Sequence, residues 1–139
     1  MSEDGHLPTP PTGVVVPWLS VTDGPAAVTF YRTAFGASVR YRAEDRSGRV
    51  VVAQLRVGPA EFWLQENRDA RPGSGHGRIH MTLAVKESDA VVRRALEAGA
   101  TEIAPVSDRA GWRSGRVADP FGHHWEVGSP ANTGERLRD

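Results

Sequence analysis

The sequence of 139 residues contains no cysteine and only one lysine, Lys86, among its 17 basic residues. The absence of cysteine excludes disulfide bonds, thiolate nucleophiles and cysteine-ligated metal sites. Basic and acidic residues balance at 17 each, which leaves no net charge to attract nucleic acid or an anionic membrane surface. No apolar run approaches the ~20 residues that a membrane-spanning helix needs, and the N-terminal segment has no signal-peptide core. These absences favour a cytoplasmic protein without nucleic-acid or membrane partners.

The composition that is present is that of a globular protein, with 39% hydrophobic and 24% charged residues. A chain of this length is sufficient for one well-packed domain and short for two independent ones. Residues 1–13 are polar and proline-rich and are predicted to form a disordered arm, and a disordered tail is predicted for residues 129–139. The domain then spans residues 14–128, interrupted by a polar linker at residues 67–77 that is rich in glycine, arginine and proline.

A hairpin near the C-terminus has the clearest pattern in the chain. Asp119–Gly122 contains proline and glycine at positions that favour a type I turn, and a short strand is predicted to follow at residues 123–128. Side chains alternate along a strand, so Trp125 is expected in the core and His124 and Glu126 on the opposite face. We therefore expect one side of this strand to belong to the core and the other to a functional site.

The hairpin has a counterpart upstream, because Gly58–Leu64 is also a turn followed by an alternating strand. Trp63 and Glu126 then correspond at a spacing of 63 positions. The Gly-Ala helix ends at Gly36 and Gly99 are also 63 positions apart. Two independent markers with the same spacing indicate an internal duplication.

Each copy of the duplication is predicted to have the element order β-α-β-β-β, in module one at residues 14–66 and in module two at residues 78–128. Apolar residues recur with helical spacing after Asp23, and Gly36 is expected to end that helix, while Ser88 is expected as the N-cap of the second helix. The predicted fold class is therefore α+β, with two tandem βαβββ modules that form a curved mixed sheet around a cleft. The predicted strands are residues 14–21, 38–44, 49–57, 61–66, 78–85, 102–106, 113–118 and 123–128.

One face of each predicted sheet is covered by its helix, which leaves the other face for a partner or a ligand. The side chains expected there are partly polar and partly aromatic, a composition that suits a ligand cleft. Arg56 and Gln54 either orient a carboxylate or amide group of a ligand or form a solvated strand face. Trp112 is expected in the loop Ala110–Gly115, as a lid over the cleft or a dimer contact. The candidate ligand-binding residues are Trp18, Gln54, Arg56, Trp63, Gln65, Thr82, Trp112 and His124.

Several short motifs stand in a specific order along the chain, namely Phe30-Tyr31, Phe35-Gly36-Ala37, Gly58, Arg78-Ile79-His80, Ala98-Gly99-Ala100 and Asp119-Pro120-Phe121-Gly122 with Glu126. A duplicated βαβββ chain with these motifs resembles the vicinal oxygen chelate superfamily, which includes glyoxalase I, bleomycin-resistance proteins, fosfomycin-resistance enzymes and extradiol dioxygenases. The small single-domain glyoxalase-like branch is the most similar. The resemblance extends from Val14 to Gly128 and implies two modules that form a cleft, often completed by a second subunit, so a homodimer is expected.

Metal enzymes of that superfamily bind a divalent ion through one residue from the first and last strand of each module, typically two His and two Glu. Carried over to this sequence, the four positions are Val16, Trp63, His80 and Glu126. Val16 and Trp63 have no lone pair to offer, and two ligands alone hold a divalent ion weakly. No cofactor is therefore expected, and any metal ion would depend on His80 and Glu126. The substitute ligands that lie nearby in the sequence are Glu61, Gln65 and His124.

The resemblance leaves more than one function open. We expect a metal-free small-molecule-binding protein of the glyoxalase or bleomycin-resistance type, which sequesters a planar drug-like compound or metabolite in an aromatic-lined cleft and acts in antibiotic resistance. The alternative is an enzyme of the same superfamily, either a divalent-metal lyase, isomerase or dioxygenase, or a metal-free acid–base catalyst that uses His80 and Glu126. A dimeric scaffold without a ligand is a third interpretation. In the simplest interpretation, His80 and Glu126 only hydrogen-bond each other and close the floor of the cleft.

Overall fold

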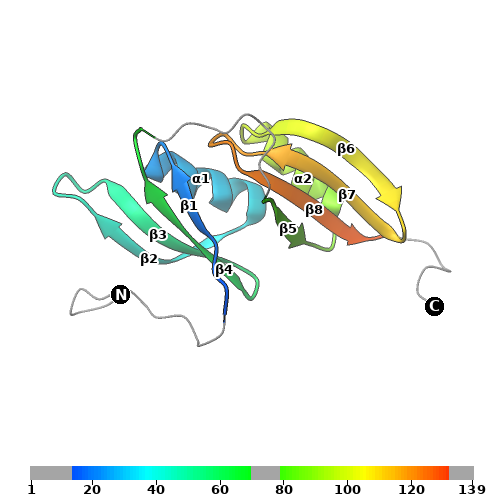
Figure 1. Ribbon diagram of the computed structural model, residues 1–139, viewed down its shortest axis with the longest axis horizontal. Coiled ribbons are helices and arrows are strands. Elements are labelled where there is room, and N and C mark those ends of the chain that lie inside the picture. Colours follow the sequence, from blue (N-terminus) through cyan, green and yellow to red (C-terminus); the bar gives the residue numbers. More distant parts are fainter. Residues whose placement is uncertain (1–13, 70–78, 132–139) are drawn as a thin grey trace. The chain divides into compact units, whose positions relative to one another are not determined.

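The computed structural model describes residues 14–69 and 79–131, which form two modules of one helix and four strands each (Figure 1). The predicted arm, most of the predicted linker and the chain beyond residue 131 lie outside the described residues. Within the two described ranges, no helix is long and apolar enough to cross a membrane. The elements of module one are β1 (Trp18–Val21), α1 (Gly24–Phe35), β2 (Ser38–Glu44), β3 (Val50–Val57) and β4 (Ala60–Glu66). Those of module two are β5 (Met81–Ala84), α2 (Ser88–Glu97), β6 (Thr101–Arg109), β7 (Trp112–Ala118) and β8 (His124–Pro130).

Each module forms its own four-stranded mixed sheet, with the strand order β1-β4-β3-β2 in module one and β5-β8-β7-β6 in module two. The first strand of each module pairs in parallel with the last, β1 with β4 and β5 with β8, and the other neighbours are antiparallel. In Figure 1, α1 and α2 each lie against one face of the sheet of their own module. The predicted α+β class and the tandem βαβββ order are confirmed.

Helix α1 begins and ends as its sequence predicts. Asp23 Oδ1 accepts a hydrogen bond from the backbone N–H of Ala26 at 2.9 Å, and a proline occupies the first turn. At the other end, Gly36 has a φ of 70° and its N–H donates to a carbonyl of the last helical turn. The apolar stripe faces the sheet, where Tyr31 meets Phe62 of β4 edge to face at a centroid distance of 5.2 Å. The buried residues of this stripe are Ala27, Phe30, Tyr31 and Ala34.

The N-terminus of α1 is tied to β4 through Glu66, whose side chain is 5% exposed. Its Oε1 accepts hydrogen bonds from the backbone N–H of Gly24 at 2.8 Å and from Arg49 Nε at 2.9 Å. Its Oε2 accepts a hydrogen bond from Arg68 Nε at 3.0 Å. The Gly24 N–H and then the two arginines lower the pKa of Glu66 below its ordinary value. The carboxylate therefore fixes the start of α1 against the end of the sheet.

Helix α2 begins differently from the prediction. Glu87 is its N-cap and makes no side-chain capping bond, whereas Ser88, the predicted N-cap, is the first helical residue and is buried. The hydroxyl groups of Ser88 and Ser129 are hydrogen-bonded at 2.9 Å. The prediction was wrong because the Ser88 side chain is engaged with β8 and does not fold back onto the free N–H groups of the helix. The buried helical residues are Ser88, Val91, Val92 and Ala95.

The turn between β7 and β8 is organised by the carboxylate of Asp119, which is buried. The Gly122 N–H donates to the Asp119 carbonyl at 3.0 Å, which closes the predicted turn. Asp119 Oδ1 accepts hydrogen bonds from the backbone N–H groups of Phe121 and His123, at 3.0 and 2.9 Å. Its Oδ2 accepts a hydrogen bond from Trp125 Nε1 at 2.9 Å. One carboxylate thus satisfies three donors and connects the predicted core tryptophan to the turn.

The first strand of each module is shorter than predicted. β1 begins only at Trp18, since Pro17 cannot donate to the ladder and its carbonyl alone takes part, by accepting from the Trp63 N–H at 2.9 Å. β5 begins at Met81. Ile79 lies within the predicted strand at residues 78–85 but precedes the observed strand, and it is 81% exposed.

Larger corrections fall in the second half of module two. β6 extends to Arg109, beyond the predicted end at residue 106. Trp112 was predicted in a loop but is the first residue of β7, because the hairpin turns through Ala110 and Gly111, which both have positive φ. β8 continues to Pro130, so its last two residues belong to a strand and not to the predicted disordered tail.

Candidate functional site

Each sheet has one face against its helix and an open face on the other side, and the strand register decides which side chains share the open face. In module one, Trp18 of β1 pairs with Trp63 of β4. In module two, the corresponding pair is Thr82 of β5 with Glu126 of β8. The register therefore confirms the predicted alignment of the two copies. We call Trp18, Tyr41 and Trp63 the aromatic face of module one, and His80, Ser114, Arg116 and Glu126 the polar cluster of module two.

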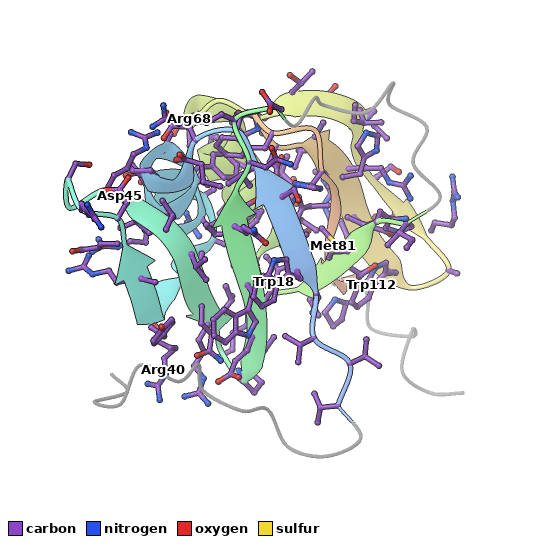
Figure 2. All side chains as sticks on the ribbon, turned by 60° about the vertical axis from the view of Figure 1, so that its left-hand side comes forward. Trp18, Arg40, Asp45, Arg68, Met81 and Trp112 are labelled. Atoms are coloured by element: carbon purple, nitrogen blue, oxygen red, sulfur yellow. The ribbon has the colours of Figure 1, made fainter. Side chains whose placement is uncertain are left out.

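The aromatic face is a set of neighbouring rings on β1, β2 and β4, with Trp18 in front of the sheet in Figure 2. The Trp18 and Trp63 rings are stacked, with centroids 5.1 Å apart and planes 8° from parallel, and the Tyr41 ring is 5.7 Å from Trp63. Trp18 is 47% exposed, whereas Trp63 is only 3% exposed. The prediction of an accessible wall at Trp63 is therefore wrong, because Trp18 covers that ring. Trp18 is therefore the more accessible of the two tryptophan rings.

Polar side chains border the aromatic face. Trp18 Nε1 donates to Gln65 Oε1 at 3.0 Å. Gln54 Nε2 donates to Glu61 Oε1 at 3.0 Å, and Arg56 Nη2 lies 3.5 Å from Glu61 Oε2. The candidates Gln54, Arg56 and Gln65 therefore lie along this border, and the proposed substitute metal ligands Glu61 and Gln65 are already engaged. Among the described residues, Arg56 Nε is a buried nitrogen that lacks a hydrogen-bond partner.

The polar cluster brings the two predicted catalytic residues together. His80 Nε2 lies 3.4 Å from Glu126 Oε1, and 34% and 28% of the two side chains are exposed. Arg116 Nη2 lies 3.3 Å from His80 Nε2 and 3.9 Å from Glu126 Oε1. Ser114 Oγ donates to Glu126 Oε2 at 3.0 Å and holds that carboxylate in place. His80 Nε2 can accept a hydrogen bond from Arg116 in the tautomer whose Nε2 carries no proton and can donate one to Glu126 in the other.

A concave basin of about 450 Å³ lies on the open face of module two. Trp112 forms one wall, and Arg109 and the polar-cluster residues Arg116 and Glu126 also line it. The Trp112 ring lies over Gly128, where a Cβ atom would come within 2.4 Å of Trp112 Nε1. Glycine at this position of β8 therefore makes room for the indole. Trp112 therefore lies on a strand and lines the basin, and not in the loop that the sequence predicted.

Sequence reasoning missed Arg116 and Ser114 as site residues. Both lie on β7, and their pairing with β8 places them on the open face. Alternation along β7 outward from the buried Val117 is the signal that would have found them. Thr82 and His124 were predicted as ligand-binding residues; they lie on β5 and β8, and neither lines the basin.

The side chains of the polar cluster do not fit a divalent metal ion. His80 and Glu126 supply two donors, and the Arg116 guanidinium beside both would repel a cation. At the corresponding positions of module one, Val16 and Trp63 supply none. Across the described part of the chain, no three His, Cys, Asp or Glu side chains are grouped closely enough to hold a metal ion.

Comparison with protein families identifies this arrangement. The glyoxalase-like domain family matches residues 15–128, which include all of the strands and helices but the end of β8. The chain belongs to this family. Its membership also places the chain in the vicinal oxygen chelate superfamily, as the sequence motifs predicted. Uncharacterized proteins of Mycobacterium bovis and Mycobacterium tuberculosis are 37% identical over 123 residues, which cover 82% of this chain and 81% and 72% of those proteins.

Solved structures share the fold of this glyoxalase-like chain. TioX from Micromonospora sp. ML1 is 25% identical, with a TM-score of 0.67 over 88% of this chain and 99% of TioX. The fosfomycin resistance protein FosX from Listeria monocytogenes is 16% identical, with a TM-score of 0.67 over 87% and 95% of the two chains. A glyoxalase-related enzyme from Fulvimarina pelagi is 22% identical, with a TM-score of 0.65 over 85% and 88%. The last two comparisons show the fold alone.

Proposed function

We propose that this glyoxalase-like protein binds a small planar organic ligand without a metal ion and sequesters it. The observation that carries the proposal is the position of Arg116, whose guanidinium lies 3.3 Å from His80 Nε2 and 3.9 Å from Glu126 Oε1. The guanidinium cation of Arg116 therefore lies beside both His80 and Glu126, the two donors that a divalent ion would need. Ligand binding then depends on protein groups alone.

The lining of the basin indicates which ligand chemistry it suits. Its volume of about 450 Å³ is in the range of sites for small organic molecules. Trp112 offers a flat surface for stacking, and the guanidinium groups of Arg109 and Arg116 offer anchors for an acidic group. A planar compound that carries a carboxylate or a similar anion fits this lining. The exposed ring of Trp18 is a second stacking surface, on module one.

Sequestration is the role that such a binder performs without chemistry, since it lowers the free concentration of a harmful compound. Fosfomycin resistance proteins share the fold, and resistance to a drug-like compound is part of the proposal. We also propose that the protein acts as a homodimer in the cytoplasm. Light scattering coupled to size-exclusion chromatography measures the oligomeric state, and a monomer at working concentration would contradict the dimer.

A thermal-unfolding scan tests the metal-free part of the proposal. Chelator-treated protein should keep its midpoint when Ni²⁺, Mn²⁺, Zn²⁺, Fe²⁺ or Mg²⁺ is added in excess. An ion at about 100 times its dissociation constant would add about 2.7 kcal/mol, several degrees in a domain of this size. A clear shift that disappears in His80→Ala would overturn the proposal. Arg116→Ala is the matched variant, because removal of the guanidinium should allow weak binding by the two remaining donors.

A fluorescence screen with planar acidic compounds tests the ligand part. Binding in the basin should change the emission of Trp112, and Trp112→Ala should weaken the affinity about tenfold, the loss of one good stacking contact. Trp18→Ala is the control for contact with module one, and Trp63→Ala tests the position that the sequence favoured. Unchanged affinity in both Trp112→Ala and Trp18→Ala would exclude these walls as the binding surface.

One observation favours a second candidate function, metal-free acid–base catalysis. His80 Nε2 and Glu126 Oε1 are 3.4 Å apart, both side chains are partly exposed, and Glu126 lines the basin, so a ligand there would lie beside a paired base and acid. Any ligand found in the screen can be incubated with the protein and followed by NMR. Chemical change that is lost in both His80→Gln and Glu126→Gln would support catalysis, and an unchanged ligand would support sequestration.

A further inference from the structure

A second hollow lies on module one, along the outer edge of β2. It has a volume of about 500 Å³ and lies between the last turn of α1 and the first residues of β2. β2 is an edge of its sheet and pairs with β3 only, so the backbone groups on its other side are not used by the sheet. The lining includes Ser38, Tyr41 and three arginines, Arg32, Arg40 and Arg42, which we call the arginine groove.

The arginine side chains of this groove have few partners. Within the described residues, the side chains of Arg32 and Arg40 have no hydrogen-bond or ion-pair partner, and Arg42 Nε is 3.7 Å from Glu44 Oε2. Only one of the three guanidinium groups therefore lies beside a carboxylate. Elsewhere in the described chain, a carboxylate oxygen lies within 3.9 Å of each of Arg49, Arg56, Arg68, Arg113 and Arg116.

The backbone has a specific irregularity at this place. Val39 pairs with Leu55 and Tyr41 pairs with Gln54, so Arg40 has no opposite residue on β3 and sits in a β-bulge. A bulge redirects a side chain away from the regular alternation of the strand. Figure 2 shows Arg40 at the end of the module-one sheet, with its side chain directed away from the ribbon.

The approach of Arg32 has a local cause as well. Gly36 ends α1 in the left-handed conformation, and the chain turns directly into β2. This tight connection brings the last helical turn beside the first residues of the strand. Arg32 therefore joins the groove from the helix, while Arg40 and Arg42 join it from the strand.

We propose that the arginine groove binds the diphosphate group of a small organic phosphate. Guanidinium groups bind phosphate oxygens through paired, charge-assisted hydrogen bonds, and three of them can engage more oxygens than a single carboxylate presents. The groove has an excess of positive charge over Glu44, which is opposite in sign to the charge of a diphosphate. None of the three arginines belongs to the basin or the polar cluster, so this site is separate from the basin, although it shares Tyr41 with the aromatic face.

Titration calorimetry with inorganic pyrophosphate at fixed ionic strength tests the site. Arg40→Gln and Arg32→Gln should each weaken binding about tenfold or more, since each loses a charge-assisted contact. Arg42→Gln should weaken it less, because Arg42 is shared with Glu44, and Glu44→Gln should strengthen it. Arg46→Gln is the matched control, because it removes the same charge from an exposed turn of the same module and should leave the affinity within about twofold. Circular dichroism of each variant confirms that the fold is intact.

Titrations with two further ligands, adenosine diphosphate and adenosine, test whether the groove recognises a nucleotide or the diphosphate group alone. Adenosine diphosphate that binds more tightly than pyrophosphate would support a nucleotide, and equal binding would support recognition of the diphosphate alone. Adenosine that binds as tightly as adenosine diphosphate would overturn the proposal, because the phosphates would then contribute nothing. It would also be overturned by absence of binding at about 1 mM pyrophosphate, a free energy near −4.1 kcal/mol, or by an equal loss in Arg46→Gln and Arg40→Gln.

Discussion

The two modules share one framework and differ in the chemistry of their open faces. Leu64 and Val127 occupy corresponding positions in the last strands, and both are fully buried. At the adjacent open-face position, Trp63 of module one corresponds to Glu126 of module two. The duplication has kept apolar side chains where they fill a core, and the open faces have diverged into an aromatic surface and a charged one. Position in the framework therefore predicts packing, and only the individual residue predicts chemistry.

The modules also fasten the start of the helix to the last strand in different ways. In module one the connection is ionic, from Glu66 to the Gly24 N–H and two arginines. In module two the corresponding positions hold Ser88 and Ser129, whose hydroxyl groups share one hydrogen bond. One contact is charged and responds to pH, and the other is neutral.

The largest expected difference in stability is between variants of two aspartates that organise turns, one in each module. Asp45 Oδ1 accepts hydrogen bonds from Ser47 and the Arg49 N–H in an exposed turn of module one, whereas Asp119 holds three donors in a buried turn of module two. Asp119→Ala should lower the free energy of unfolding by about 3 kcal/mol or more, because buried donors lose their acceptor. Asp45→Ala should lower it much less, because water replaces the carboxylate. Urea unfolding measures both, and equal losses would contradict the role of Asp119.

A smaller effect is expected from the first helical residue of each module. A Cβ atom on Gly24 would lie 2.3 Å from the Val50 carbonyl oxygen, so Gly24→Ala should lower the free energy of unfolding by about 2–3 kcal/mol through steric overlap. Ser88→Ala should cost about 1 kcal/mol, the value of one hydrogen bond. Urea unfolding compares the two variants. If Gly24→Ala were as mild as Ser88→Ala, the close approach of α1 to β3 would be disproved.

The pH dependence of stability should differ between the ionic and the neutral connection. Because the pKa of Glu66 is lowered in the folded state, its contribution is complete above its ordinary value of 4.5 and is lost as pH falls through the folded pKa. At about pH 7, Glu66→Gln should be less stable than the wild type by about 1–2 kcal/mol, and the difference should shrink below the folded pKa. Ser129→Ala is the control and should show the same loss at both ends. A pH-independent loss in Glu66→Gln would refute the ionic account.

The smallest effect concerns the stacked rings of module one. Trp18→Ala should cost about 1 kcal/mol through loss of the stacking contact and should shift the emission of Trp63 to longer wavelength as that ring meets water. Trp18→Phe keeps an aromatic ring over Trp63 and should therefore shift the Trp63 emission less. Thr82→Ala at the corresponding position of module two should change neither. Fluorescence and urea unfolding measure these effects, and an unshifted emission in Trp18→Ala would mean that another group covers Trp63.

Much of the framework could be predicted because its signals are local. Asp23 and Gly36 mark the ends of α1 within a few residues of where their effects occur, and the Asp119–Gly122 turn closes on itself. The correspondence of Trp63 and Glu126, predicted from their spacing of 63 residues, is also confirmed, because the two copies have the same strand register. These features can be predicted because they depend only on residues that are close in the sequence or on an internal repeat.

The predictions failed where the position of a side chain depends on a contact between two segments that are distant in the sequence. The burial of Trp63 depends on the parallel partner strand that carries Trp18, and the place of Trp112 depends on the missing side chain of Gly128. The contact of Arg116 with His80 joins β7 to the residue before β5, which is far from it in the sequence. Such contacts depend on register and side-chain volume across the sheet, which periodicity along one strand does not contain.

The parallel pairing of first and last strands has a consequence for how the chain is made. The ladder between β1 and β4 closes within module one, so its sheet can be completed once Glu66 has left the ribosome, before module two has emerged. Each module must hold its first strand open across an intervening helix and two strands until the last one arrives, which is a slow, non-local step. An unpaired Trp18 strand is therefore the segment most exposed to aggregation during synthesis.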